Sequence, residues 1–338
     1  MAFMSAADYG RPEQAKVFRS SIDRLLTTLF AMPRFKRHGG RDFAVALSHP
    51  ALVSAWMQQL CSDTGLLHGY FMLPELGAIC GQRRSGQGLH GTELMPYTAV
   101  ANVVLSTPVA GTVRPIFLYM GAGCGHDPFY TSAGKRLRKA VVDELSGVAP
   151  DVQVSCACAP CPDKVPHAEM QQQLRQSLFC PMVAGDTPSS ARLTEAVVAG
   201  CIPVFFGPPW HTMPLPDAID WASIGVYINI TSLTPWLAAN STVGGQQSEA
   251  AISWFLAVSP QTADVAHVTV NLPSLQAAYA YLRAMPGARI ERLQAALDSE
   301  RLKLFYGTGP GGYSQLADAA LANMLRFGAS LSPTTPQP

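Results

Sequence analysis

The residues best suited to bind an anion lie in one segment, residues 185–204, with the sequence GDTPSSARLTEAVVAGCIPV. Ser189 and Ser190 carry hydroxyl donors, and Arg192 carries a guanidinium that can bind a phosphate through two parallel hydrogen bonds. Gly185 has no side chain, so a ligand can approach the backbone closely there. Donors of these types, gathered at the start of a helix, form a site suited to a diphosphate.

The spacing of the segment indicates how a helix positions these groups. Thr187 suits the N-cap, Pro188 suits the first helical position, and Gly200 suits the position after the last turn. The pattern therefore predicts a helix over residues 188–199, followed at once by a strand. Glu195 lies one turn further along the same face, where its carboxylate can accept hydrogen bonds from a ribose diol.

The same residues also fit an ordinary structural interpretation. Thr-Pro-Ser-Ser is a common start of a helix, and Arg192 and Glu195 are spaced as an i,i+3 ion pair. Local physics alone leaves the binding site and the simple surface helix both open.

The rest of the chain alternates between helical and extended patterns. Apolar runs that predict strands cover residues 42–47, 69–73, 115–120, 151–155, 177–183, 201–206 and 224–230. Helical spacing covers residues 12–30, 50–60, 133–146, 167–176, 188–199, 246–258, 273–284, 288–305 and 313–327. Apolar strands between helices are typical of a parallel sheet covered on both faces. We therefore predict an α/β fold, with a linker at residues 106–115.

Composition excludes several classes of protein. The 338 residues carry a formal net charge of +1 and only 14% are charged, so a nucleic-acid binder with a broad basic surface is excluded. No run of about 20 apolar residues predicts a membrane span. Cys156, Cys158 and Cys161 lack the paired spacing of a zinc site, so we expect a disulfide or free thiols there and no metal. Cys180 and Cys201 lie in apolar runs and are expected to be small core residues.

An ordered series of motifs resembles the signature of the exostosin family, the family 47 glycosyltransferases. The chain has the motif SLFC at residues 177–180, GDTPSSARLTE at 185–195, GCIPV at 200–204 and AIDW at 218–221. Weaker matches lie upstream, at residues 34–45, at Arg114-Pro115-Ile116 with Gly121, and at Leu137-Arg138. The resemblance covers residues 34–230.

This resemblance implies a GT-B fold, in which two Rossmann-like domains with parallel sheets face each other across a cleft. It implies an inverting glycosyltransferase that moves a sugar from a nucleotide sugar, expected to be a UDP-sugar, to a polysaccharide or glycoprotein glycan. The residues that match the donor site by position are Gly121, Arg138, Gly185, Ser189, Ser190, Arg192 and Glu195. Glu195 is expected to bind the ribose and the others to surround the diphosphate. No metal or other cofactor is expected.

The resemblance also implies an organisation into domains. We expect an N-terminal acceptor-side domain at residues 1–107, a nucleotide-sugar-binding domain at 112–310, a C-terminal helix at 311–327 and a disordered tail at 328–338. The family's first strand and membrane anchor have no counterpart ahead of the first match, so we expect a truncated N-terminal domain. The family context implies the lumenal side of the Golgi membrane and a homo- or hetero-oligomer with another glycosyltransferase.

An inverting transfer needs a general base that deprotonates the acceptor hydroxyl. Asp42, on the first predicted strand, is the first candidate and His49 is the second. Asp42 fits equally well as a cap of the turn at Gly39 and Gly40. Two alternatives to an active transferase stay open: a catalytically impaired exostosin-like binding or partner subunit, and an unrelated α/β phosphate-binding enzyme.

Overall fold

The structure is a computed structural model of the 338-residue chain. It describes residues 20, 24, 27–28, 30–38, 44–46, 70–73, 92–94, 110–122, 132–156, 165–183, 190–206, 213–233, 242–243, 246–247, 263–304 and 315–330. Most of these residues form one α/β unit in the second part of the chain, and a smaller set lies before residue 110.

A six-stranded sheet forms the centre of the α/β unit. Its strands are β4 (Ile116–Ala122), β5 (Val152–Cys156), β6 (Ser177–Met182), β7 (Ile202–Phe206), β8 (Val226–Ile230) and β11 (Thr269–Leu272). They lie in the order β11-β8-β7-β6-β4-β5, and all neighbouring strands are parallel. Every residue of β7 is buried, as expected for an apolar strand covered on both faces. The predicted α/β class is confirmed.

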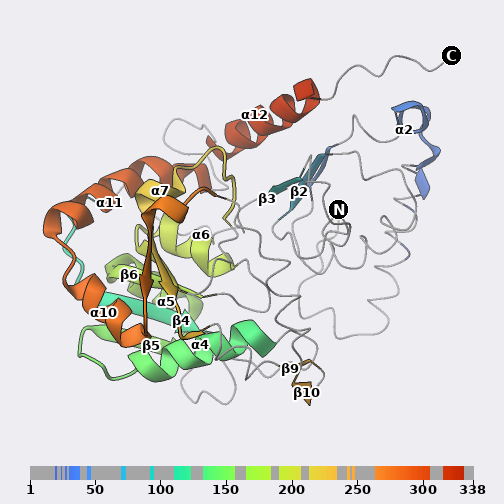
Figure 1. The fold of residues 1–338 in the computed structure, drawn as a ribbon. Coiled ribbons are helices and arrows are strands. Elements are labelled where there is room, and N and C mark those ends of the chain that lie inside the picture. Colours follow the sequence, from blue (N-terminus) through green and yellow to red (C-terminus); the bar gives the residue numbers. More distant parts are fainter. Residues whose placement is uncertain are drawn as a thin grey trace.

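Helices cover both faces of this sheet (Figure 1). They are α4 (Ser132–Leu145), α5 (His167–Gln176), α6 (Ala191–Val198), α7 (Trp221–Ile224), α10 (Leu275–Arg283) and α11 (Gly287–Glu300). One core cluster joins α5, α6 and α7 to the sheet, and includes Met170, Leu174, Leu193, Val197 and Trp221. A second cluster joins α4 and α10 to the sheet, and includes Val141, Leu145, Leu275, Ala278 and Leu282.

The described residues before residue 110 include a second, smaller parallel sheet. Its strands are β1 (Ala44–Ala46), β2 (Tyr70–Leu73) and β3 (Thr92–Leu94), in the order β1-β2-β3, and α2 (Pro33–His38) precedes them. Two of these strands were predicted, whereas β3 is too short to give a pattern in the sequence. Two separate parallel sheets are consistent with a GT-B-like architecture.

Several predicted boundaries differ from the structure. The helix expected over 188–199 begins at Ala191, with Ser190 rather than Thr187 as its N-cap, because the Ser190 hydroxyl accepts a hydrogen bond from the Arg192 N–H. The strand expected from residue 224 begins at Val226, because Asp220 caps the short helix α7 ahead of it.

Differences also occur near the end of the chain. Gln246–Gln247 form strand β10, paired with β9 (Thr242–Val243), where a helix over 246–258 was predicted. The expected disordered tail from residue 328 is wrong at its start, since α12 (Gln315–Ser330) continues past that point. The predicted helix over 288–305 is confirmed as α11, followed by the 3₁₀ turn η5 (Arg301–Leu304).

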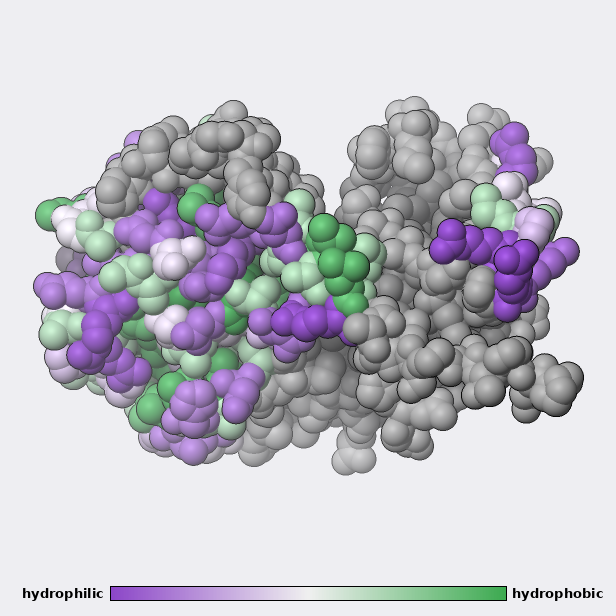
Figure 2. Space-filling view, turned by 90° about the horizontal axis from the view of Figure 1, so that it is seen from above, coloured by the Kyte–Doolittle hydropathy of each residue, from purple (hydrophilic) through white to green (hydrophobic). Residues whose placement is uncertain are grey.

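Helix α12 presents apolar side chains to solvent. Leu321 and Leu325 are 48% and 61% exposed and lie one turn apart. The described surface in the view from above is otherwise a mixture of hydrophilic and weakly apolar residues (Figure 2). Among the described residues, no helix combines the length and apolar character needed to span a membrane.

A half-buried arginine joins the linker to the helices of the unit. The Arg114 guanidinium donates to the Ser177 carbonyl oxygen at 2.8 Å and the Ala199 carbonyl oxygen at 3.4 Å, at the ends of α5 and α6. Burial, with a smaller contribution from the nearby positive charge of Arg301, lowers the pKa of Arg114 to about 10. Asp298 offsets this repulsion: it forms an ion pair with Arg301 at 3.0 Å and accepts from the Ala110 N–H.

The two cysteines expected to be small core residues are buried as predicted, but they are bonded to each other. Cys180 on β6 and Cys201, just before β7, form a disulfide with a Cα–Cα distance of 5.8 Å. The sequence interpretation missed the bond because an apolar context favours a free buried thiol equally well. The disulfide closes the segment that contains α6.

We predict that the disulfide contributes substantially to stability. The double variant Cys180→Ala/Cys201→Ala should lose about 3 kcal/mol of unfolding free energy, since the bond closes a loop of sequence separation 21. Urea unfolding of both proteins measures this difference. In excess dithiothreitol the two unfolding curves should converge, and a difference that persists there would show that packing rather than the bond is responsible.

We also predict that Arg114 is needed for the fold. Arg114→Leu should lower the unfolding free energy by about 3 kcal/mol, because it leaves buried carbonyl groups without their donor. Val113→Ala, at a side chain that is 89% exposed, is the matched control and should leave stability unchanged. Equal urea midpoints for Arg114→Leu and the wild type would contradict this role.

Candidate functional site

The order of the strands defines where a ligand would bind. From β4 the chain moves to β5 on one side, then crosses back to β6 on the other side of β4. The helices that follow β4 and β6 therefore lie on opposite faces of the sheet, and the carboxyl ends of these two strands form a topological switch point. At a switch point an open parallel sheet has a crevice between the diverging helices. Such switch points are the usual ligand sites of open parallel sheets.

Two residues predicted from the sequence meet at this crevice. The Arg138 guanidinium, on α4, donates to the Ser190 hydroxyl oxygen at 3.4 Å and to the Val183 carbonyl oxygen at 3.4 Å. Val183 follows the end of β6, and Ser190 is the N-cap of α6. The contact thus brings a cation to the positive end of the α6 dipole, where an anion would be stabilised by both.

Arg192, in the first turn of α6, forms an ion pair with Glu195, one turn further along the helix. The Arg192 Nη1 donates to the Glu195 Oε2 at 2.8 Å, and the two side chains are 24% and 11% exposed. The same nitrogen contacts the Met170 sulfur on α5. The i,i+3 pair foreseen in the sequence therefore exists, but it is partly buried beside the crevice rather than solvated on a surface.

A tyrosine that the sequence analysis did not single out lies beneath this pair. The hydroxyls of Tyr119 and Ser155 share a hydrogen bond of 2.7 Å, and Tyr119 is 1% exposed. Burial raises the pKa of Tyr119, and the charges of Arg192, Glu169 and Glu195 also act on it. The phenol therefore stays protonated. Tyr119 lies two residues before the predicted Gly121, so both positions are on the same face of the strand. This spacing could have identified Tyr119 from the sequence.

Gly121 lies on β4 above this tyrosine. A Cβ atom at Gly121 would approach the Tyr119 hydroxyl oxygen to 3.1 Å and the Ser155 hydroxyl oxygen to 3.6 Å. A side chain at this position would disturb the hydrogen bond between them. The absence of a side chain also keeps the end of β4 open toward the crevice.

The structure thus brings together five of the predicted residues: Gly121, Arg138, Ser190, Arg192 and Glu195. Gly185 and Ser189, and the two candidate bases Asp42 and His49, lie outside the described residues. In the part of the chain that the structure describes, no group of three or more His, Cys, Asp or Glu side chains is placed to hold a metal ion.

The fold and this crevice define a class of protein: a doubly wound α/β protein with a basic, helix-capped crevice at its switch point. The family to which it belongs follows from comparison with known proteins. The model of the Exostosin GT47 domain matches residues 2–238. The chain belongs to the exostosin GT47 family.

Curated relatives match over a short stretch. A probable glucuronosyltransferase from Oryza sativa subsp. japonica is 42% identical over 62 residues, which is 18% of this chain and 14% of the relative. A probable β-1,4-xylosyltransferase from Arabidopsis thaliana is 42% identical over 57 residues, 17% of this chain and 14% of the relative. A probable glucuronosyltransferase from Physcomitrium patens is 38% identical over 61 residues, 18% and 13% of the two chains. The matches span about one seventh of these relatives.

We predict that Arg192 contributes to the binding of a nucleoside diphosphate. Arg192→Ala should weaken binding of UDP by about 1.5–3 kcal/mol, the range for a hydrogen bond to a charged group. Isothermal titration calorimetry measures this change. Arg289→Ala is the matched control, because Arg289 donates to the Tyr281 hydroxyl on another part of the fold and should not affect UDP. Equal affinities of wild type and Arg192→Ala would remove Arg192 from the site.

Proposed function

We propose that this protein is an inverting glycosyltransferase that transfers a sugar from a UDP-sugar to a polysaccharide or glycoprotein glycan. The observation that carries the proposal is the convergence of Arg138, Ser190 and Arg192 at the start of α6, at the switch point of a parallel sheet. Membership in a family whose members are named as glucuronosyl- and xylosyltransferases supports the same chemistry.

The donor fits this crevice through its charged part. Two guanidinium groups and the positive end of the α6 dipole complement a diphosphate, with Gly121, Gly185 and Ser189 beside it in our proposal. Glu195 would accept hydrogen bonds from the ribose diol. Because Arg192 is already paired with Glu195, a diphosphate would have to replace or share that contact.

In the proposed reaction a general base removes the proton from an acceptor hydroxyl as its oxygen attacks the anomeric carbon. The bond from that carbon to the diphosphate oxygen breaks, and UDP leaves with the bonding electron pair. Arg138, Arg192 and the α6 dipole would stabilise this developing negative charge. Asp42 is the first proposed base and His49 the second. The sugar is transferred with inversion because the attack comes from the face opposite the leaving group.

The remaining proposals concern the cellular context. We propose a donor-binding domain at residues 112–310 and an acceptor-side domain at 1–107. We also propose action on the lumenal side of the Golgi membrane, in a homo- or hetero-oligomer with another glycosyltransferase. The buried Cys180–Cys201 disulfide supports a secretory compartment, because disulfides persist in oxidising environments.

A second candidate function is a catalytically impaired binding or partner subunit. The partly buried ion pair of Arg192 and Glu195 favours this second function. In this pair the Glu195 carboxylate neutralises the positive charge that is expected to bind the diphosphate. Such a protein would still bind a nucleotide sugar but would not break its glycosidic bond.

The two functions are separated by incubating the full chain with a panel of UDP- and GDP-sugars that includes UDP-glucuronate and UDP-xylose. Release of free UDP, with transfer to an oligosaccharide acceptor, is expected of the enzyme. Arg138→Ala and Arg192→Ala should each lower the rate by about tenfold or more. Tight UDP binding without release of UDP from any donor would instead identify a binding subunit.

We further predict that donor binding needs no divalent metal. The positive groups at the start of α6 replace the metal that other transferases use at the diphosphate, and the nearby sequence has no acidic pair to hold one. UDP affinity measured with EDTA and with added Mn²⁺ should agree within about twofold. Loss of affinity in EDTA that Mn²⁺ restores would overturn this prediction.

A further inference from the structure

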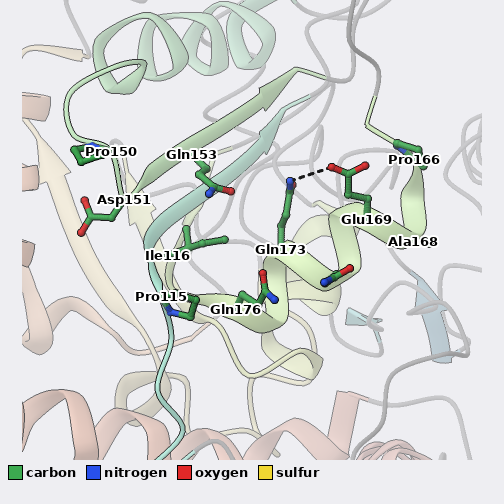
Figure 3. Close-up of a pocket in the computed structure, with 11 residues that line it drawn as sticks. Pro115, Ile116, Pro150, Asp151, Gln153, Pro166, Ala168, Glu169, Gln173 and Gln176 are labelled. Atoms are coloured by element: carbon green, nitrogen blue, oxygen red, sulfur yellow. Dashed lines mark hydrogen bonds between the residues drawn. The ribbon is translucent and has the colours of Figure 1, made fainter.

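A groove of about 930 Å³ with a mixed polar and apolar lining lies between helix α5 and the strands at one edge of the sheet. Its strand side is formed by the starts of β4 and β5, with Pro115, Pro150 and Gln153. Its helix side is formed by one face of α5, with Glu169, Gln173 and Gln176 among the residues exposed to it. Figure 3 shows Gln153 on the strand side extending toward Gln173 on the helix side.

The groove follows the length of α5. Its lining includes Pro166 at the N-cap and Gln176 at the last helical position, so it extends over the ten residues of α5, about 15 Å. The first turn of α5 lies beside the donor crevice, because Met170 contacts Arg192. The other end lies at the amino ends of the strands. The groove therefore leads away from the proposed donor site along the edge of the sheet.

The chemistry of the lining selects an uncharged, hydroxyl-rich ligand. Four glutamine amides line the groove: Gln153, Gln172, Gln173 and Gln176. Each amide offers donors and an acceptor side by side, which matches the paired hydroxyls of a sugar. No lysine, arginine or histidine is among the described residues that line the groove, which disfavours a phosphate or a nucleic acid. Asp151, one of two lining carboxylates, is ion-paired with Arg283, which lowers its pKa.

One amide in the groove lacks a full set of partners. The Gln173 Oε1 is buried and accepts no hydrogen bond from the described residues, while its Nε2 donates to Glu169 at 3.5 Å, the limit of such a bond. Because this oxygen is costly to bury without a donor, the side chain gains a hydrogen bond if it turns toward a ligand hydroxyl in the groove. The prolines at 115, 150 and 166 add rigid apolar surface for the C–H faces of pyranose rings.

We propose that this groove is a second glycan-binding site, which holds a stretch of neutral polysaccharide remote from the sugar being transferred. The proposal rests on the proposed function for the choice of a glycan. Such a site would keep a long acceptor attached between transfers, because it adds contacts beyond those at the reacting sugar.

The test is binding of xylohexaose and cellohexaose to the full chain, measured by calorimetry alongside UDP. Gln153→Ala/Gln173→Ala should weaken binding of the oligosaccharide that the wild type binds by about tenfold or more and leave UDP affinity unchanged. Arg192→Ala should do the reverse. Gln276→Ala, a glutamine on α10 that bonds Glu144 outside the groove, should change neither affinity. Gln176→Trp, at an exposed position, should block the groove without removing a hydrogen bond of the fold.

Unchanged oligosaccharide affinity in both groove variants would overturn the proposal, as would a wild type that binds neither oligosaccharide. A polyproline decapeptide that binds the wild type, and is lost in the groove variants, would assign the groove to a protein partner and also overturn it. In each case intact UDP binding would leave the proposed donor site standing. A wild-type protein that binds the oligosaccharide but does not bind UDP would contradict only the proposed donor site.

Discussion

The arrangement of the α/β unit depends on one half-buried cation. Arg114 lies in the linker just before β4, and its guanidinium donates hydrogen bonds to carbonyl oxygens at the ends of α5 and α6. These carbonyl groups belong to the C-cap residues of α5 and α6, where the helix itself leaves carbonyl groups without a partner and a side-chain donor can satisfy them. Its charge is tolerated because Asp298, one turn before Arg301, lies nearby and offsets the repulsion between the two arginines. The linker, α5, α6 and α11 are therefore fixed to one another.

This constraint determines where the functional groups lie. Helices in a parallel α/β unit run opposite to the strands, so fixing the ends of α5 and α6 at one edge places their starts at the other edge. There α6 presents Ser190 and Arg192 to Arg138 from α4, and the first turn of α5 brings Met170 against Arg192. The groove along α5 uses the side of the same helix that faces away from the core. Helix α5 therefore lies next to both proposed sites, the donor site and the groove.

Much of this arrangement could be predicted from the sequence. Runs of five to seven residues identified every strand of the large sheet except β11, whose residues are only partly buried or exposed and include Asn271. The motif at residues 185–204 indicated the proposed anion site, because serine, arginine and a helix start occur there together in the sequence. The Cys180–Cys201 bond could not be predicted, because two apolar contexts do not show that β6 and β7 are neighbours.

The sequence by itself determined the α/β class and the residue types of the crevice, since both depend on short-range patterns of burial and capping. Only the tertiary structure decided that Arg138 meets Ser190 across 52 residues, and that Tyr119 bonds Ser155 beneath Gly121. It also decided that Arg192 is paired and partly buried rather than solvated. Which residues meet depends on the order of the strands in the sheet. That order results from long-range packing, which cannot be inferred from the spacing of neighbouring residues in the sequence.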